Sequence, residues 1–252
     1  MAFSLADVSL AEAALVAGTA FGASIIGGMA GYGTGLLMPL VLVPIIGAEN
    51  VVPVIAVTAL FTNASRFIAL RAAVDWRKAA LMLPLALPLT MASAYGFTRL
   101  DNRGASILIG TMLIVLVPLR RWLSHAGFRL QGWQLMPAGG VYGFVSGAST
   151  GAGVILISFL MAAGLTGPAV IATDAAISIA IGLAKASTFG FNAALPLPLL
   201  VFALIIGCAT VPGAFLAKRL LDVIPVRLHT LMLEAVIVLG GAIVLARGLF
   251  GR

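Results

Sequence analysis

Long apolar stretches recur along the chain and limit what it can fold into. A helix of about 20 residues, rising about 1.5 Å per residue, crosses the hydrocarbon core of a bilayer, which is about 30 Å thick. Hydrophobic residues make up 62% of the sequence and charged residues 9%, whereas roughly a quarter of the residues of a soluble domain are charged. The sequence therefore predicts an all-α polytopic membrane protein with a single membrane domain over residues 1–252. The predicted spans are Leu10–Ile26, Val51–Leu70, Ala79–Phe97, Ala105–Leu119, Val170–Phe189, Pro196–Ala217 and Leu231–Leu249.

Two glycine-rich runs interrupt the apolar sequence. The first covers 27–35 and leads into Leu36–Ile46, and the second covers 146–153 inside the apolar stretch Leu135–Leu165. Each of these segments is too long for one straight span and too short for two full ones. Glycine weakens a helix by roughly 1 kcal/mol relative to alanine. We therefore expect each run to break a re-entrant or crossing segment and to be followed by a half-helix.

The two halves of the chain match each other in order. Gly33 and Gly35 correspond to Gly151 and Gly153, and the segment 95–100 corresponds to 215–220. We interpret the chain as two repeats of about four spanning helices plus one broken or re-entrant glycine-rich segment each, at about 10–122 and 133–250. Internal repeats build many secondary transporters, with the substrate between the repeats.

The distribution of positive charge indicates how the repeats are oriented, because Lys and Arg gather in cytoplasmic loops. The basic residues at 71–78, 120–129 and 218–227 share one face if each glycine-rich segment enters and leaves the membrane on the same side. The charge imbalance is then larger than for a single crossing. Segments that turn back in this way predict that the two repeats are inverted and that the face rich in basic residues lies in the cytoplasm.

Polar residues share one face of the predicted span Val51–Leu70. Thr58, Thr62 and Arg66 are spaced by four residues, and Asn63 comes three residues before that arginine. An arginine inside a span is costly, although near a helix end its side chain can reach the interface. Arg66 is therefore either a snorkelling residue that helps to set the topology or part of an anion site. The threonines and Asn63 could equally make interhelical hydrogen bonds.

The corresponding span of the second half, Val170–Phe189, carries Asp174, Ser178 and Lys185 on one side. Asp174 is the most deeply placed acid in the sequence. A buried carboxylate either pairs with a cation or takes up a proton. Proton coupling through Asp174 is one hypothesis, and an ion pair with Lys185 or Arg66 is the alternative.

The glycine breaks favour an anion site near the middle of the membrane. A half-helix that follows a break directs its N-terminal N–H groups and the positive end of its dipole at the break. The alternative is close helix packing through small residues, which the spacing of Gly27, Gly31 and Gly35 allows. The candidate substrate-binding residues are Gly33, Thr34, Gly35, Thr62, Asn63, Arg66, Ser149, Thr150, Gly151, Gly153 and Ser178, and the candidate coupling residues are Asp174 and Lys185.

One order of elements characterises the first half and returns in weaker form in the second. A glycine-rich segment ending at Pro39 precedes the polar helix Thr58–Arg66, which is followed by Val74-Asp75-Trp76-Arg77 and by a helix ending at Arg99. This order resembles the TauE/SafE family of sulfite exporters over nearly the whole chain. The second repeat departs from it, since Ile157 stands where the first has Pro39. The resemblance implies a carrier of the bacterial inner membrane for sulfite, organosulfonates or related small anions.

Other classes of function have little support in the sequence. The net charge of +7 reflects membrane topology and does not indicate nucleic-acid binding. His125 and His229 lack the spacing of a metal site, and Cys208 has no nearby histidine to act as a base. No ATP-binding GxxxxGK[ST] motif occurs.

We therefore expect no enzyme activity, no metal and no cofactor, and a gradient as the source of energy. The alternative to a coupled secondary transporter is an anion channel or uniporter without coupling. The expected partners are the small anion and the lipid bilayer, and a homo-oligomer stays open.

Overall fold

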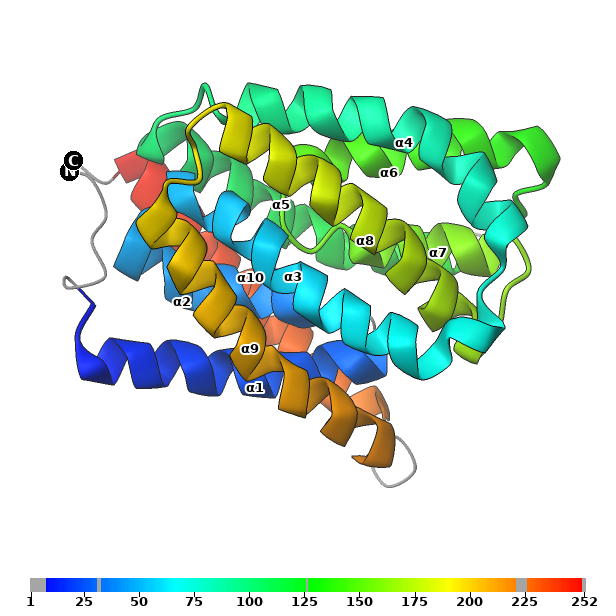
Figure 1. The fold of residues 1–252 in the computed structure, drawn as a ribbon, viewed down its shortest axis with the longest axis horizontal. Helices are drawn as coiled ribbons and strands as arrows, with labels where there is room; N and C mark the ends of the chain where they lie inside the picture. The colour runs from blue at the N-terminus through cyan, green and yellow to red at the C-terminus, as the bar shows by residue number, and fades with distance from the viewer. Residues whose placement is uncertain (1–7, 31–32, 126, 221–225, 251–252) are drawn as a thin grey trace.

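The structure is a computed structural model that describes residues 8–30, 33–125, 127–220 and 226–250. These residues form helices and connecting segments, with no strand among them (Figure 1), which confirms the predicted all-α class. The elements are α1 (Leu10–Ala30), α2 (Gly33–Ile46), α3 (Ala48–Leu70), η2 (Arg71–Ala73), α4 (Trp76–Phe97), α5 (Asn102–His125), η3 (Gly132–Gln134), α6 (Leu135–Ala148), α7 (Gly153–Ala162), α8 (Pro168–Phe191), α9 (Leu197–Leu220) and α10 (Val226–Phe250).

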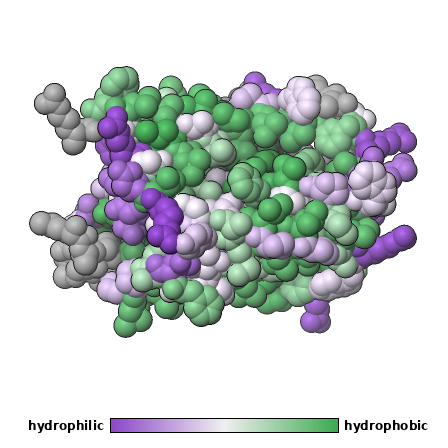
Figure 2. Space-filling model, turned by 90° about the horizontal axis from the view of Figure 1, so that it is seen from above, coloured by the Kyte–Doolittle hydropathy of each residue, from purple (hydrophilic) through white to green (hydrophobic). Residues whose placement is uncertain are grey.

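The long helices run between two polar ends of the molecule. Figure 2 shows hydrophilic side chains gathered at both ends and a broad hydrophobic surface between them. Among the described residues, five helical segments are long and apolar enough to cross a membrane, as a polytopic protein requires. They are Ala48–Ala73, Trp76–Phe97, Asn102–Leu123, Pro168–Phe191 and Leu197–Ala217.

The second glycine-rich segment is a hairpin that turns back inside the molecule. The predicted stretch Leu135–Leu165 divides into α6 and α7, which have 14 and 10 residues. The chain enters and leaves this hairpin at the same end, because the Leu130 N–H group before α6 donates to the carbonyl of Ala162 at the end of α7 (2.9 Å). A half-helix does follow the break, since α7 begins at Gly153.

The first glycine-rich segment forms a second hairpin that enters from the opposite end. α1 packs against α2, which begins at Gly33, and the chain returns to the end from which α1 started (Figure 1). The first glycine run is helical up to Ala30, and its residues 31–32 lie outside the described part of the chain. Each glycine-rich segment therefore enters and leaves at the same end of the molecule, which is the arrangement that the charge distribution favours.

The two hairpins determine at which end of the molecule each connecting segment lies. The connections at 71–75, 127–134 and 163–167 lie at one end of the molecule, and those at 98–101 and 192–196 lie at the other (Figure 1). The first end carries Arg71 and Arg129 in its connections and the exposed Trp76 and Trp133 beside them. This is the end whose basic residues predict a cytoplasmic location.

Turn residues fix where two of the spanning helices begin. The carboxylate of Asp75 caps α4 by accepting the Lys78 N–H group (3.0 Å). α8 begins with Pro168, which needs no hydrogen-bond acceptor for its nitrogen in the first turn. The residue before it, Gly167, has a φ of +54°, which favours glycine.

A stripe of glycines sets the packing of α6 on α4. Gly139, Gly143 and Gly147 repeat every four residues, and a Cβ on each would overlap a backbone carbonyl of α4. The carbonyls belong to Met82, Ala86 and Thr90, which also repeat every four residues. The two backbones therefore touch along one line, as small residues allow between membrane helices.

The remaining helix contacts come in corresponding pairs. α6 packs on α4 and α1 on α9, while α3 packs on α9 and α8 on α4. Likewise, α2 contacts α3 and α10, and α7 contacts α8 and α5. The α3–α8 and α5–α10 contacts complete the central packing. These contacts bring the tips of the two hairpins together beside α3 and α8.

Candidate functional site

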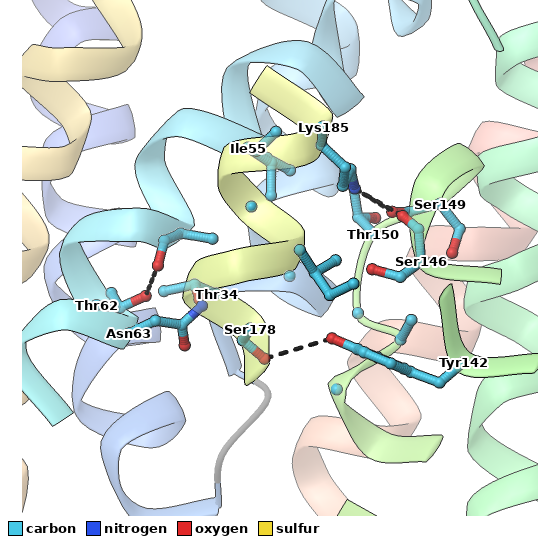
Figure 3. A pocket seen from close by; sticks show the side chains of 18 of the residues that line it. Thr34, Ile55, Thr62, Asn63, Tyr142, Ser146, Ser149, Thr150, Ser178 and Lys185 are labelled. Carbon is cyan, nitrogen blue, oxygen red and sulfur yellow. Dashed lines mark hydrogen bonds between the residues drawn. The ribbon is translucent and has the colours of Figure 1, made fainter. Parts of the chain in front are cut away.

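A cavity of about 90 Å³ lies where the tips of the two hairpins meet α3 and α8. Figure 3 shows polar side chains directed into it from several of these elements. A space of this size holds a few water molecules or one small ion. Its lining residues are Thr34, Gly35, Ile55, Ala56, Ala59, Thr62, Asn63, Arg66, Tyr142, Ser146, Ser149, Thr150, Gly151, Ala152, Gly153, Ser178, Ile181, Gly182 and Lys185.

The sequence-predicted site residues converge on this cavity. Of the substrate-binding candidates, all but Gly33 line it, and Gly33 begins α2 one residue before the lining residue Thr34. Of the two coupling candidates, Lys185 lines the cavity, and Asp174 contacts it through Arg66. Residues far apart in the sequence are thus brought to one place.

The two glycine breaks are in backbone contact at the cavity. A Cβ placed on Gly35 would lie 2.6 Å from the amide nitrogen and 2.8 Å from the Cα atom of Gly151. Gly151 has a φ of +79°, a conformation that side chains rarely adopt. A Cβ there would also overlap the side chain of Leu36. Only glycine fits at either position without movement of the hairpins.

Each hairpin places one threonine hydroxyl at the cavity with no hydrogen-bond partner in the described protein. Thr34 comes from the first turn of α2 and is 8% exposed, and Thr150 comes from the α6–α7 break and is 4% exposed. Both side chains line the cavity (Figure 3). Both hydroxyls are therefore available to donate to a ligand with acceptor oxygens.

Arg66 forms an ion pair with Asp174 at one side of the cavity. Arg66 Nη1 lies 3.0 Å from Asp174 Oδ2, and the two side chains are 10% and 1% exposed. Of the two cations that the sequence offered as partners for the acid, the structure pairs it with Arg66 and not with Lys185. The same guanidinium also donates to Asn63 Oδ1 through Nη2. Arg66 is held inside the protein and does not snorkel.

The contact with Arg66 also orients the Asn63 amide. Since Oδ1 accepts from the guanidinium, the amide nitrogen must point away from it. Figure 3 shows this nitrogen on the side of Asn63 nearest Thr34. Asn63 is buried and lines the cavity, and within the described residues its NH₂ group has no acceptor. It is a further donor for a ligand.

Lys185 reaches the broken end of α6 from the opposite side of the cavity. Its Nζ donates to the carbonyls of Ser146 (2.7 Å) and Ser149 (3.0 Å). These carbonyls belong to the last turn of α6 and to the break, where helical N–H partners run out, although the Ser146 carbonyl also accepts the Ser149 N–H group (3.4 Å). A cation at a helix C-terminus is also favourable to the helix dipole. Lys185 therefore stabilises the break.

Tyr142 and Ser146 line the cavity although neither is among the predicted site residues. The Tyr142 hydroxyl lies 3.3 Å from Ser178 Oγ and so joins α6 to α8 (Figure 3). The spacing of Tyr142, Ser146 and Ser149 by four and three residues was the available signal, since it puts them on one helical face. The glycines of the same segment directed the interpretation to the helix break and not to this face.

Two polar residues near the site serve packing instead. Thr58 donates to the Ala203 carbonyl of α9 (3.2 Å), which is the interhelical hydrogen bond considered for it from the sequence. Thr173 accepts the N–H group of Asp75 (2.9 Å) and so attaches the α3–α4 connection to the residue before Asp174. Neither hydroxyl is directed into the cavity.

These features define the chain as a multi-pass membrane protein in which two broken hairpins from opposite ends enclose a small polar cavity. Within the described residues, no group of three or more His, Cys, Asp or Glu side chains could hold a metal ion. A family model described as "Sulfite exporter TauE/SafE" matches residues 16–244. The chain belongs to this family of membrane transporters, which confirms the resemblance seen in the sequence. No curated protein and no solved structure gives a significant match to the chain.

Proposed function

We propose that the protein is a secondary transporter of small sulfur oxyanions, such as sulfite or organosulfonates, in the bacterial inner membrane. The substrate site is the cavity between the hairpin tips. The family supports the sulfur chemistry of the substrate, and the donor groups of the cavity support an anion.

The observation that carries the proposal is the set of donors that lack an acceptor. One threonine hydroxyl from each hairpin and the Asn63 amide face the cavity, and none has an acceptor among the described residues. The N-terminus of α2 adds a positive dipole end on the same side as Thr34. A pyramidal or tetrahedral oxyanion has several acceptor oxygens and could bind these donors together.

The paired helix contacts support two inverted repeats around this site. Exchanging α1–α5 with α6–α10 in order turns the α4–α6 contact into α9–α1, and the α2–α10 contact into α7–α5. Hairpins from opposite ends that meet in the middle are what inverted repeats produce. Such repeats would put the two glycine breaks on either side of a substrate at the midplane.

Energy for transport would come from an ion gradient, and Asp174 is the candidate proton carrier. The acid is fully buried and shares Arg66 with the cavity. Uptake of a proton by Asp174 would release the guanidinium toward the anion, and loss of the proton would restore the ion pair. In this mechanism, substrate binding and proton binding favour each other.

Flux in proteoliposomes tests the proposal. Purified protein should move sulfite or a small sulfonate, and an imposed pH gradient should drive accumulation against the concentration gradient. Downhill flux without accumulation would instead show an anion channel or uniporter. Absence of flux with sulfite, sulfonates and small carboxylates would contradict the proposed function.

A further inference from the structure

The charges at the cavity do not balance. Two cations line it, Arg66 and Lys185, and one carboxylate, Asp174, pairs with the first of them. Within the described residues, no carboxylate lies within ion-pair distance of Lys185, whose hydrogen bonds go to two backbone carbonyls. The site therefore carries one positive charge that no carboxylate of the described residues neutralises.

This charge is buried. Lys185 is 6% exposed and lies six residues before the end of α8, a helix long and apolar enough to span a membrane. An ammonium in such a place is costly unless an anion accompanies it. Carbonyl oxygens reduce that cost through their partial charges, but they supply no net negative charge.

Lys185 also has a donor left for a ligand. An ammonium group has three N–H donors, and two of them are directed at the Ser146 and Ser149 carbonyls. The third has no acceptor in the described protein, and the side chain lines the cavity together with Thr150 (Figure 3). A ligand oxygen near Thr150 would complete the coordination of the ammonium.

We propose that Lys185 is the group that neutralises the bound substrate, so that the site selects an oxyanion with a single negative charge, such as a sulfonate or hydrogen sulfite, over a dianion such as sulfate. This inference rests on the proposed function, because it concerns the anion that the same cavity binds. The selection applies to the form in which Asp174 is ionised, as in the ion pair seen here, because Asp174 then cancels the charge of Arg66, which contributes hydrogen bonds and geometry.

Binding of a permanent monoanion and a permanent dianion tests the inference. Methanesulfonate and sulfate are titrated at pH 7 into the purified full-length protein, with sulfite as a reference, by calorimetry and by thermal shift. The wild-type protein should bind methanesulfonate more tightly than sulfate. Lys185→Gln keeps a side chain that can donate to the carbonyls but removes the charge, and should weaken methanesulfonate binding by at least about thirtyfold.

A second variant tests the charge balance in the opposite direction. Asp174→Asn adds one net positive charge to the cavity, so the ratio of sulfate to methanesulfonate affinity should rise. This ratio decides the question even where Lys185→Gln fails to fold. Arg99→Gln is the control. It removes a cation from the connection at 98–101, outside the residues that line the cavity, and should leave the affinities for methanesulfonate and sulfate unchanged.

Equal binding of the two anions by the wild-type protein, or full affinity for methanesulfonate in folded Lys185→Gln, would overturn the inference and leave an anion transporter in place. Absence of binding by methanesulfonate, sulfate and sulfite would overturn the inference and the proposed function together.

Discussion

Gly35 in α2 and Gly151 in the α6–α7 break are in direct backbone contact, although they belong to hairpins that enter the protein from opposite ends. A Cβ on Gly35 would lie 2.6 Å from the Gly151 nitrogen, closer than nonbonded atoms approach. The contact forms one wall of the cavity and fixes the distance between Thr34 and Thr150 on either side of it.

Gly35→Ala should therefore damage both transport and stability. The added methyl group must push the hairpins apart, which costs about 1–3 kcal/mol in a well-packed interior and displaces the donors from each other. We expect at least a tenfold loss of flux in proteoliposomes and a lower melting temperature in detergent. Gly22→Ala in α1 is the matched control, because nothing lies within 4 Å of its new Cβ. Normal flux in Gly35→Ala would show that the contact is not required.

The two free threonine hydroxyls should contribute directly to affinity. Thr34→Val and Thr150→Val keep the shape of each side chain and remove its donor. A hydrogen bond to a charged group is worth about 1.5–3 kcal/mol, so each change should weaken anion binding by roughly tenfold or more. Thr188→Val is the control, because its hydroxyl bonds to the Ala184 carbonyl of its own helix (2.8 Å). If Thr34→Val and Thr150→Val bind the anion as tightly as Thr188→Val and the wild type do, the two hydroxyls do not bind the anion.

Asp174→Asn should separate coupling from binding. The amide cannot take up a proton, so accumulation driven by a pH gradient should disappear while the variant still binds the anion. Flux measured with and without an imposed pH gradient, in parallel with wild type, makes the comparison. Pumping that responds to the gradient in Asp174→Asn as in the wild type would rule out this residue as the proton carrier.

The carboxylate of Asp75, outside the spanning helices, should make stability depend on pH. Its hydrogen bond with the Lys78 ammonium, at 2.5 Å, lowers the pKa of Asp75 below its ordinary value. The folded protein thus prefers the charged form. The resulting stabilisation is complete above the unfolded pKa, about 3.9, and is lost as the pH falls through the lowered folded value.

Asp75→Asn is the matched variant for this effect, because asparagine also caps a helix but does not titrate. The melting temperature of wild type should exceed that of Asp75→Asn at pH 7, and the difference should shrink as the pH is lowered from 5 to about 3. A difference that stays constant over this range would contradict the role of the carboxylate charge.

Much of the candidate site could be predicted because its residues follow helical periodicity. The spacing of Thr62, Asn63 and Arg66 placed them on one face of α3, and all three line the cavity. The glycine runs predicted a half-helix after each break, and α2 and α7 begin at Gly33 and Gly153, inside or at the end of the runs. These features depend on local backbone geometry, which the sequence encodes directly.

The partners of the buried charges could not be predicted in the same way. Asp174 had Arg66 and Lys185 as two candidate partners, and the choice depends on how α8 crosses α3. Lys185 lies eleven residues beyond Asp174, which is about 16 Å along the helix, and it bonds to carbonyls instead. Any residue has a backbone carbonyl, so the sequence contains no sign of these acceptors.

The line of glycines between α6 and α4 also has a mechanical consequence. Because Gly139, Gly143 and Gly147 each fit against a carbonyl of α4, sliding one helix along the other would bring all three contacts into collision until a shift of four residues, about 6 Å, had passed. We therefore expect α4 and α6 to move together as one rigid body during the transport cycle. The hinge that opens the cavity would then lie across the α3–α8 crossing, where a Cβ on Gly182 would overlap only the flexible end of the Leu60 side chain and would lie 3.7 Å from the Ala56 carbonyl oxygen.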